Sequence, residues 1–211
     1  MTAISEVSIC NQALIALGAT TIVSLTENSK NARLCNAIYK QTRDDVLTDH
    51  VWNFAQKRAV LATLSEEPAW DEDEMAVVYQ KPTDCLKINF VNIESAIVKI
   101  EEDKILSNET GLKIKYTQRM TDPMKFFPKF VSALAARLAA ELAFPITKNR
   151  SLAESLFAIY YEKKLPQAMA ADSQQGTPTG ALQNDILISR IHGSGAIAGR
   201  TDQETWYPCC Y

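Results

Sequence analysis

The residues best suited to catalysis are four consecutive carboxylates, Asp71, Glu72, Asp73 and Glu74, in a proline-containing stretch that we expect to be a surface loop. A pair of carboxylates can serve as general acid and base in glycoside hydrolysis when one of them has a raised pKa. Adjacent acids in a loop are usually solvated, and nothing in the sequence indicates a pocket around these four. We therefore favour no catalytic role and keep a peptidoglycan-cleaving glycosidase as the alternative function.

Patterns for metal, cofactor and nucleophile sites are weak. His50 and His192 cannot form a metal site alone, and no Cys lies at a useful offset from either. Residues 193–198 match a relaxed dinucleotide-binding pattern, but the chain ends before the strand–helix unit that this motif needs. No Ser or Cys stands in a nucleophile-elbow pattern. The sequence thus predicts no catalytic, cofactor-binding or metal-binding residue, and His50, close to Trp52, is expected to be structural.

The five cysteines do not read as a disulfide framework. Cys10 and Cys35 fall on apolar faces of expected helices, where a small buried hydrophobic residue is the favoured interpretation. Cys209 and Cys210 offer only adventitious oxidation. A run of basic and aromatic residues at 125–130 could stack on nucleic acid, but three Phe at a helix start are more often core or interface anchors.

Composition limits the possible partners. The chain has 211 residues and a net charge of −3, from 22 basic and 25 acidic residues. This balance argues against a protein built to grip nucleic acid, although DNA could slide past its surface. The first ten residues lack the features of a signal peptide. We expect no apolar run of about 20 residues able to span a bilayer, and hence a protein made in a reducing cytoplasm.

Helical periodicity dominates both ends of the expected domain. Residues 5–17 form a first helix capped by Ser5, and residues 29–47 form a second. Trp52 and Phe54, which follow the second helix, are expected to be core anchors.

The best-specified segment is an alanine-rich helix within residues 121–147. We expect Asp122 and Pro123 to open it and Pro145 to break it. A second long helix over residues 148–171 would then fold back on it as a hairpin. The alanine-rich helix is expected to be covered on more than one side, and the residues expected to pack the core or a ring of subunits are Trp52, Phe54, Phe130, Leu134, Leu138 and Leu142.

Between the helices lies a region of alternating apolar and polar residues. Residues 57–64 are ambiguous between strand and helix, and several short stretches from residue 77 to residue 117 read as antiparallel strands. The predicted fold class is α+β, mainly α: a helical bundle (residues 1–172) with a small antiparallel β insert at about 76–118.

Residues 173–211 are predicted to form an extended C-terminal arm, because their composition becomes linker-like. A small apolar island near the end cannot make its own core, so it must dock on this domain or on another chain. We favour another chain, since extended arms commonly order on a partner. The residues expected to bind are Ile186, Leu187, Ile188, Ile191, Trp206 and Tyr207.

Four blocks of the chain, taken in order, resemble a known family. They are residues 9–19 (ICNQALIALGA), 29–62 (beginning SKNARLCNAIYK), 79–88 (YQKPTDCLKI) and 117–147 (beginning TQRMTDPMKFFPKF). This arrangement is similar to the head-to-tail adaptor of short-tailed bacteriophages, also called tail tubular protein A or the tail accessory factor.

The resemblance implies a structural virion protein and not an enzyme. Members of that family form a dodecameric ring between the portal protein and the tail nozzle protein, and the ring extends the DNA channel. By resemblance, the chain is expected at the head–tail junction of a virion after synthesis in the host cytoplasm, with DNA passing through without specific binding, no cofactor and no membrane. The C-terminal arm would reach the portal. The alternative is a virion-associated glycosidase that uses the acidic loop.

Overall fold

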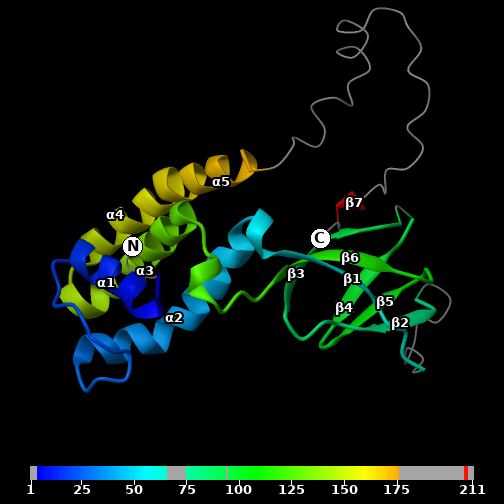
Figure 1. The fold of residues 1–211 in the computed structure, drawn as a ribbon, viewed down its shortest axis with the longest axis horizontal. Coiled ribbons are helices and arrows are strands. Elements are labelled where there is room, and N and C mark those ends of the chain that lie inside the picture. Colours follow the sequence, from blue (N-terminus) through cyan, green and yellow to red (C-terminus); the bar gives the residue numbers. More distant parts are fainter. Residues whose placement is uncertain (1–3, 66–74, 94, 176–206, 209–211) are drawn as a thin grey trace, which may run out of the picture.

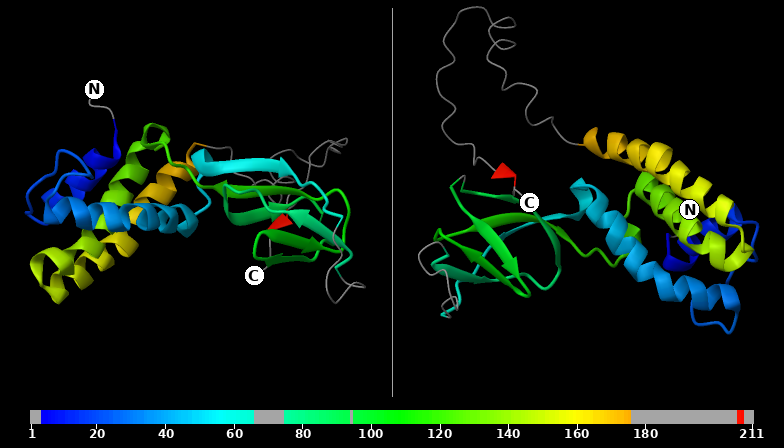
Figure 2. Two further views of the ribbon diagram at one scale, coloured as in Figure 1. Left: turned by 90° about the horizontal axis from the view of Figure 1, so that it is seen from below. Right: turned by 180° about the vertical axis from the view of Figure 1, so that it is seen from behind.

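The computed structural model describes residues 4–65, 75–93, 95–175 and 207–208. It has two parts (Figure 1): a helical body formed by residues 4–55 and 119–175, and a β region formed by residues 56–118 together with a strand at 207–208. The two parts lie side by side in all three views (Figures 1 and 2), and the chain passes from the helices to the sheets and back again.

The first two helices begin where their capping residues predict. Helix α1 (Glu6–Ala16) starts after Ser5, whose hydroxyl accepts from the Ser8 N–H, and helix α2 (Lys30–Asp49) starts after Ser29. Side-chain oxygens at these positions satisfy backbone donors that have no partner inside the helix. Gly18, just past α1, has φ +66°, a conformation that glycine adopts without strain.

Helix α3 (Pro128–Thr147) begins later and ends later than predicted. Asp122 caps a separate 3₁₀ turn, η2 (Pro123–Lys125), and α3 starts only at Pro128, which suits a first helical position. The helix continues through Pro145 and stops at Lys148, which has φ 60°. A proline near a helix end removes one hydrogen bond, and the packing of Ile146 against the core offsets that loss.

The predicted second long helix is interrupted. Helix α4 (Arg150–Ile159) leads into a π-helical turn, η3 (Tyr160–Lys164), and then into helix α5 (Leu165–Ser173). Pro166 has no N–H and its ring would clash with the carbonyl one turn earlier. The π turn absorbs this, because the Leu165 N–H bonds to the Tyr160 carbonyl five residues back. The hairpin with α3 is confirmed, since α3 and α4 pack against each other.

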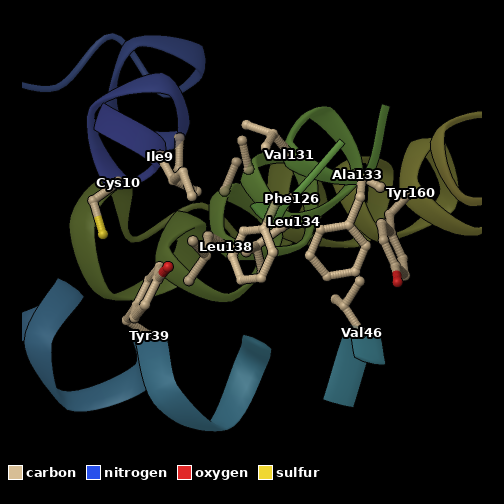
Figure 3. Close-up of a cluster of buried hydrophobic side chains, with 14 of the residues drawn as sticks. Ile9, Cys10, Tyr39, Val46, Phe126, Val131, Ala133, Leu134, Leu138 and Tyr160 are labelled. Carbon is tan, nitrogen blue, oxygen red and sulfur yellow. The ribbon is translucent and has the colours of Figure 1, made fainter. Parts of the chain in front are cut away.

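The core of the helical body surrounds α3 (Figure 3), where side chains of α1, α2 and the π turn η3 converge on it. Trp52, Phe130, Leu134, Leu138 and Leu142 are buried, and Phe54 packs against the same cluster. The expectation that α3 is covered on more than one side is confirmed.

Helix α3 corrects one expectation about membranes. By length and composition its 20 residues could cross a bilayer, although 56% of the apolar window is buried inside the structure. Burial among α1, α2 and α4 is typical of a core helix, which passes the same test because its surroundings are equally apolar.

The β region contains two antiparallel sheets, which we call sheet A and sheet B. Sheet A has the order β1-β6-β3-β7, and sheet B the order β2-β5-β4. The strands are β1 (Gln56–Val60), β2 (Val77–Gln80), β3 (Cys85–Val91), β4 (Val98–Glu101), β5 (Lys104–Ser107), β6 (Lys113–Gln118) and β7 (Tyr207–Pro208).

The prediction of a helical bundle with a small β insert is wrong, because the protein has a mixed α+β fold. The β region has a hydrophobic cluster of its own, to which both sheets contribute, with Tyr79, Ile88, Ile105, Ile114 and Tyr116 at its centre. The ambiguous stretch after Phe54 supplies β1, which pairs with β6 and so enlarges the β region. Local periodicity could not show that pairing, because it joins segments far apart in the sequence.

Candidate functional site

Most residues weighed for chemistry lie outside the described residues. This holds for the acidic run Asp71–Glu74, for His192, for residues 193–198, and for Ile186, Leu187, Ile188, Ile191 and Trp206 of the predicted arm. Within the parts of the chain that the structure describes, no group of three His, Cys, Asp or Glu side chains could hold a metal ion.

His50 is the one weighed histidine that the structure places. Its ring meets Trp52 edge to face with centroids 4.9 Å apart, and its Nε2 lies 3.8 Å from Oδ2 of Asp172. Burial lowers the pKa of His50 and outweighs the attraction of the Asp172 carboxylate. These contacts tie His50 to the end of α5 and fit the structural role expected for it.

Five aromatic rings join the two connections between the helical body and the β region, and we call them the aromatic junction. Trp52 and Phe54 lie on the outgoing connection, Phe126 and Phe127 lie on the returning one, and Phe130 lies in the first turn of α3. Phe54 meets Phe130 with centroids 4.9 Å apart, and Trp52 meets Phe130 at 5.2 Å, in edge-to-face geometry. Such pairs add to the energy of burial, so both connections are held at one place.

Asp172, near the end of α5, hydrogen-bonds to Asn53, the residue between Trp52 and Phe54 of the aromatic junction. Its carboxylate accepts the backbone N–H of Asn53 at 3.0 and 3.2 Å, and its carbonyl accepts from the Asn53 side-chain amide at 2.9 Å. Burial raises the pKa of Asp172, and the hydrogen bonds from Asn53 oppose that rise only in part. The end of α5 is therefore fixed to the segment that leads into the β region.

Two groups of charged side chains lie near the boundary between the parts: one joins the residue after β6 to α2, and the other lies within the β region. Arg119, just after β6, donates to Asp44 of α2 at 2.9 Å, and Arg43 donates to the same carboxylate at 2.7 Å. Asp84 accepts from Lys57 at 2.7 Å and from the Tyr116 hydroxyl at 2.9 Å. Burial acts to raise the pKa of Asp84, but these two hydrogen bonds outweigh it and lower that pKa.

Arg137 of α3 organises the π turn, a feature that the sequence reading missed. Its guanidinium lies 4.8 Å from the Phe157 ring centroid and 5.5 Å from those of Tyr160 and Tyr161, and it pairs with Glu141 at 3.1 Å. The Arg137 Nη1 also donates to the Tyr161 hydroxyl at 2.7 Å. The signal for this cluster was the aromatic run before Pro166, but its partner on α3 is visible only in three dimensions.

Cys10 and Cys35 are buried in the helical core, which confirms the expectation for both. Their thiols hydrogen-bond to each other, and this contact together with burial raises the pKa of Cys10 far above its ordinary value. The neutral buried thiol of Cys10 is therefore a poor nucleophile. The same hydrogen bond outweighs burial at Cys35 and lowers the pKa of that thiol, and both side chains pack in the helical core.

A hollow of about 350 Å³ lies beside the start of α2. Its two charged residues are already engaged by the chain itself. The Glu27 carboxylate accepts from the Val23 and Ser24 N–H groups, and Lys30 Nζ donates to the Pro145 carbonyl. The hollow therefore presents no free charged pair for chemistry, and the aromatic junction is the best-defined candidate site: a site for holding two bodies in place.

No protein-family model and no curated protein matches this chain.

Proposed function

We propose that this chain is a structural adaptor of a short-tailed phage, forming a ring between the portal protein and the tail nozzle protein at the head–tail junction. Four sequence blocks support the proposal by resemblance. The observation that best supports it in the fold is the aromatic junction. Its rings, packed at 4.9 to 5.2 Å in the helical core, gather the two chain connections between the helical body and the β region, each of which has its own hydrophobic cluster.

A junction of this kind suits a connector, because a connector must present two surfaces at a fixed angle. The Asp172–Asn53 contact and the Arg119–Asp44 pair restrain the same boundary at two further points. Forces passed from one surface to the other would then move the protein as a unit. In this account DNA passes through the ring without specific binding, and the protein turns over no substrate.

A closed ring requires two different contact faces on each subunit. Exposed apolar side chains on the helical body are candidates for these faces. Ile15 and Val23 lie at and after the end of α1, and Phe144 and Ile159 lie on α3 and α4. Single exposed apolar residues are common on protein surfaces, so assigning these four to subunit contacts depends on the proposal that the protein forms a ring.

The C-terminal arm supplies the test. Deleting residues 176–211 keeps Asp172 and all of α5, so the helical body retains its contact with Asn53. We expect the truncated protein to fold and yet to be lost from portal-containing heads, with the full chain as the control. Undiminished attachment by the truncated protein would contradict a portal-binding arm. Cell-wall hydrolysis by the full chain, lost on Asp71→Asn and Glu74→Gln substitution, would favour the glycosidase.

A further inference from the structure

The two buried thiols between α1 and α2 are the starting point for a second proposal. Cys10 lies on α1 and Cys35 on α2, both side chains are fully buried, and their thiols hydrogen-bond to each other. Figure 3 shows the Cys10 sulfur pointing from α1 toward α2. A disulfide needs the two sulfurs to approach to about 2.0 Å. Because the hydrogen bond already brings the thiols into contact, the pair is placed to be joined covalently.

The hydrogen bond gives the two thiols different roles. It raises the pKa of Cys10 and lowers that of Cys35, so Cys10 donates its S–H and the Cys35 sulfur accepts it. The thiolate is the reactive form of cysteine, and the Cys35 sulfur is the one that this contact stabilises as a thiolate. Cys35 is therefore the attacking sulfur, and Cys10 is held beside it.

A third polar group at the same place lacks a partner. The Tyr39 hydroxyl is buried, and among the residues that the structure describes nothing hydrogen-bonds to it. Tyr39 follows Cys35 by four positions on α2, so both side chains lie on the same face of the helix. Burial raises the pKa of Tyr39, and the nearby charges of Glu6 and Cys10 add to the rise. Buried polar groups nearly always have a hydrogen-bond partner, and an oxygen added to one of the thiols would supply the missing acceptor.

We propose that Cys35 and Cys10 form a peroxide-reactive site, in which the Tyr39 hydroxyl positions the transferred oxygen and oxidation joins α1 to α2 by a disulfide. Hydrogen peroxide is hardly larger than water, which suits sulfurs that are buried. Closing a loop between two helices by a covalent bond restricts the unfolded chain, so the oxidised protein should hold α1 more firmly. This site does not depend on the proposed adaptor function.

The reaction has two steps. The Cys35 thiolate attacks one oxygen of hydrogen peroxide, the O–O bond breaks, Cys35 becomes a sulfenic acid, and the leaving hydroxide takes up the proton that Cys35 had released. This step removes the thiolate that is the largest cause of the raised Cys10 pKa. The Cys10 sulfur then attacks the Cys35 sulfur, the S–O bond breaks, and the oxygen leaves as water with the Cys10 proton. Two thiols are oxidised to a disulfide, and one peroxide is reduced to two waters.

Hydrogen peroxide added to the purified full-length protein tests the site without any substitution. Free thiols are then alkylated in denaturant, and the protein is digested without reductant. Mass spectrometry should find a peptide in which Cys10 and Cys35 are linked, while Cys85 is recovered as the alkylated thiol. Cys85 is the internal control, because it is also buried and burial raises its pKa to about 11. A Cys10–Cys35 pair that stays reduced, or Cys85 oxidised as fast as the pair, would overturn the proposal.

Three variants separate the roles of the residues. Cys10→Ser should leave Cys35 as a sulfenic acid that dimedone traps, whereas Cys35→Ser should leave Cys10 reduced. Equal trapping in both would overturn the assignment of the attacking sulfur.

Tyr39→Phe removes only the hydroxyl, and it should slow the oxidation of Cys35 severalfold while the linked peptide remains the product. Its urea unfolding midpoint should stay at or above that of the unchanged protein, because a buried hydroxyl without a partner contributes no stability. Slower oxidation at undiminished stability separates a positioning role from a structural one. An unchanged rate of Cys35 oxidation in Tyr39→Phe would overturn the role of Tyr39.

Discussion

The Asp172 carboxylate accepts the backbone N–H of Asn53 across 119 positions of sequence. This contact joins the last turn of α5 to the residue that follows Trp52, and it closes the helical body around the aromatic junction. Asp172 holds Asn53 by three hydrogen bonds: both carboxylate oxygens accept the Asn53 backbone N–H, and the Asp172 backbone carbonyl accepts from the Asn53 side-chain amide.

Asp172→Ala is expected to lower the free energy of unfolding by about 1–3 kcal/mol, since it leaves the Asn53 N–H without its partner. Asp172→Asn is the matched variant. It keeps one acceptor oxygen, so its loss should be smaller. Urea unfolding followed by circular dichroism measures both. Equal stability of Asp172→Ala and the unchanged protein would show that the contact contributes nothing.

The pH dependence of stability should report His50. Burial lowers its pKa below the ordinary value of 6.5, so the folded protein binds a proton at His50 less readily than the unfolded chain does. The stability contribution is present above pH 6.5 and is lost as the pH falls through the lowered pKa. The pKa of Asp172 is raised, which gives the opposite sign: its contribution is present below the ordinary carboxyl pKa and lost as the pH rises.

His50→Gln therefore isolates the histidine effect while leaving Asp172 in place. We expect the urea concentration at the unfolding midpoint to decrease in the unchanged protein when the pH is lowered from 7.5 to 5.5. In His50→Gln the same change of pH should decrease it less. Parallel pH profiles for the two proteins would mean that His50 protonates equally well in the folded and unfolded chains.

Phe130 lies at the centre of the aromatic junction, where it contacts both Trp52 and Phe54 and is fully buried. Phe130→Ala is expected to cost about 3–5 kcal/mol, the usual loss for a large buried aromatic. Met124→Ala is the control, because Met124 is 71% exposed. Thermal or urea unfolding measures the stability of both variants. A Phe130→Ala protein as stable as Met124→Ala would contradict the claim that the aromatic junction stabilises the fold.

Arg137 and Arg150 form a natural comparison, since each pairs with a Glu four residues later. The Arg137 side chain is 15% exposed and lies over three rings, whereas that of Arg150 is 86% exposed. Lys cannot reproduce a stacked planar guanidinium. Arg137→Lys should cost about 1–2 kcal/mol from the lost ring contacts, and Arg150→Lys close to nothing. Equal losses in chemical unfolding would contradict a special role for the π turn.

The sequence allowed the helix starts to be predicted where a capping side chain marked them, as at Ser5 and Ser29. It misplaced the start of α3, because the Asp122 cap serves a short 3₁₀ turn and the Phe127–Pro128 step begins the helix. The extent of the β region was underestimated, since β1 is defined by its pairing with β6 and not by local alternation.

The aromatic rings of the junction were recognised as anchors, but their common meeting place was not. Phe54 and Phe130 are distant in sequence, and no spacing rule connects them. The contact of Asp172 with Asn53 was invisible for the same reason. The resemblance to phage adaptors bears on function alone, and neither the burial nor the contacts of the described residues depend on it.

The native mass of the purified full-length protein, measured alone and after mixing with portal-containing, DNA-filled heads, tests the central claim most directly. The account predicts a monomer or small oligomer in solution that becomes a closed ring on the heads, with the protein recovered in multiple copies per head. A protein that binds no heads, or that binds them equally well without their portal, would contradict the adaptor function.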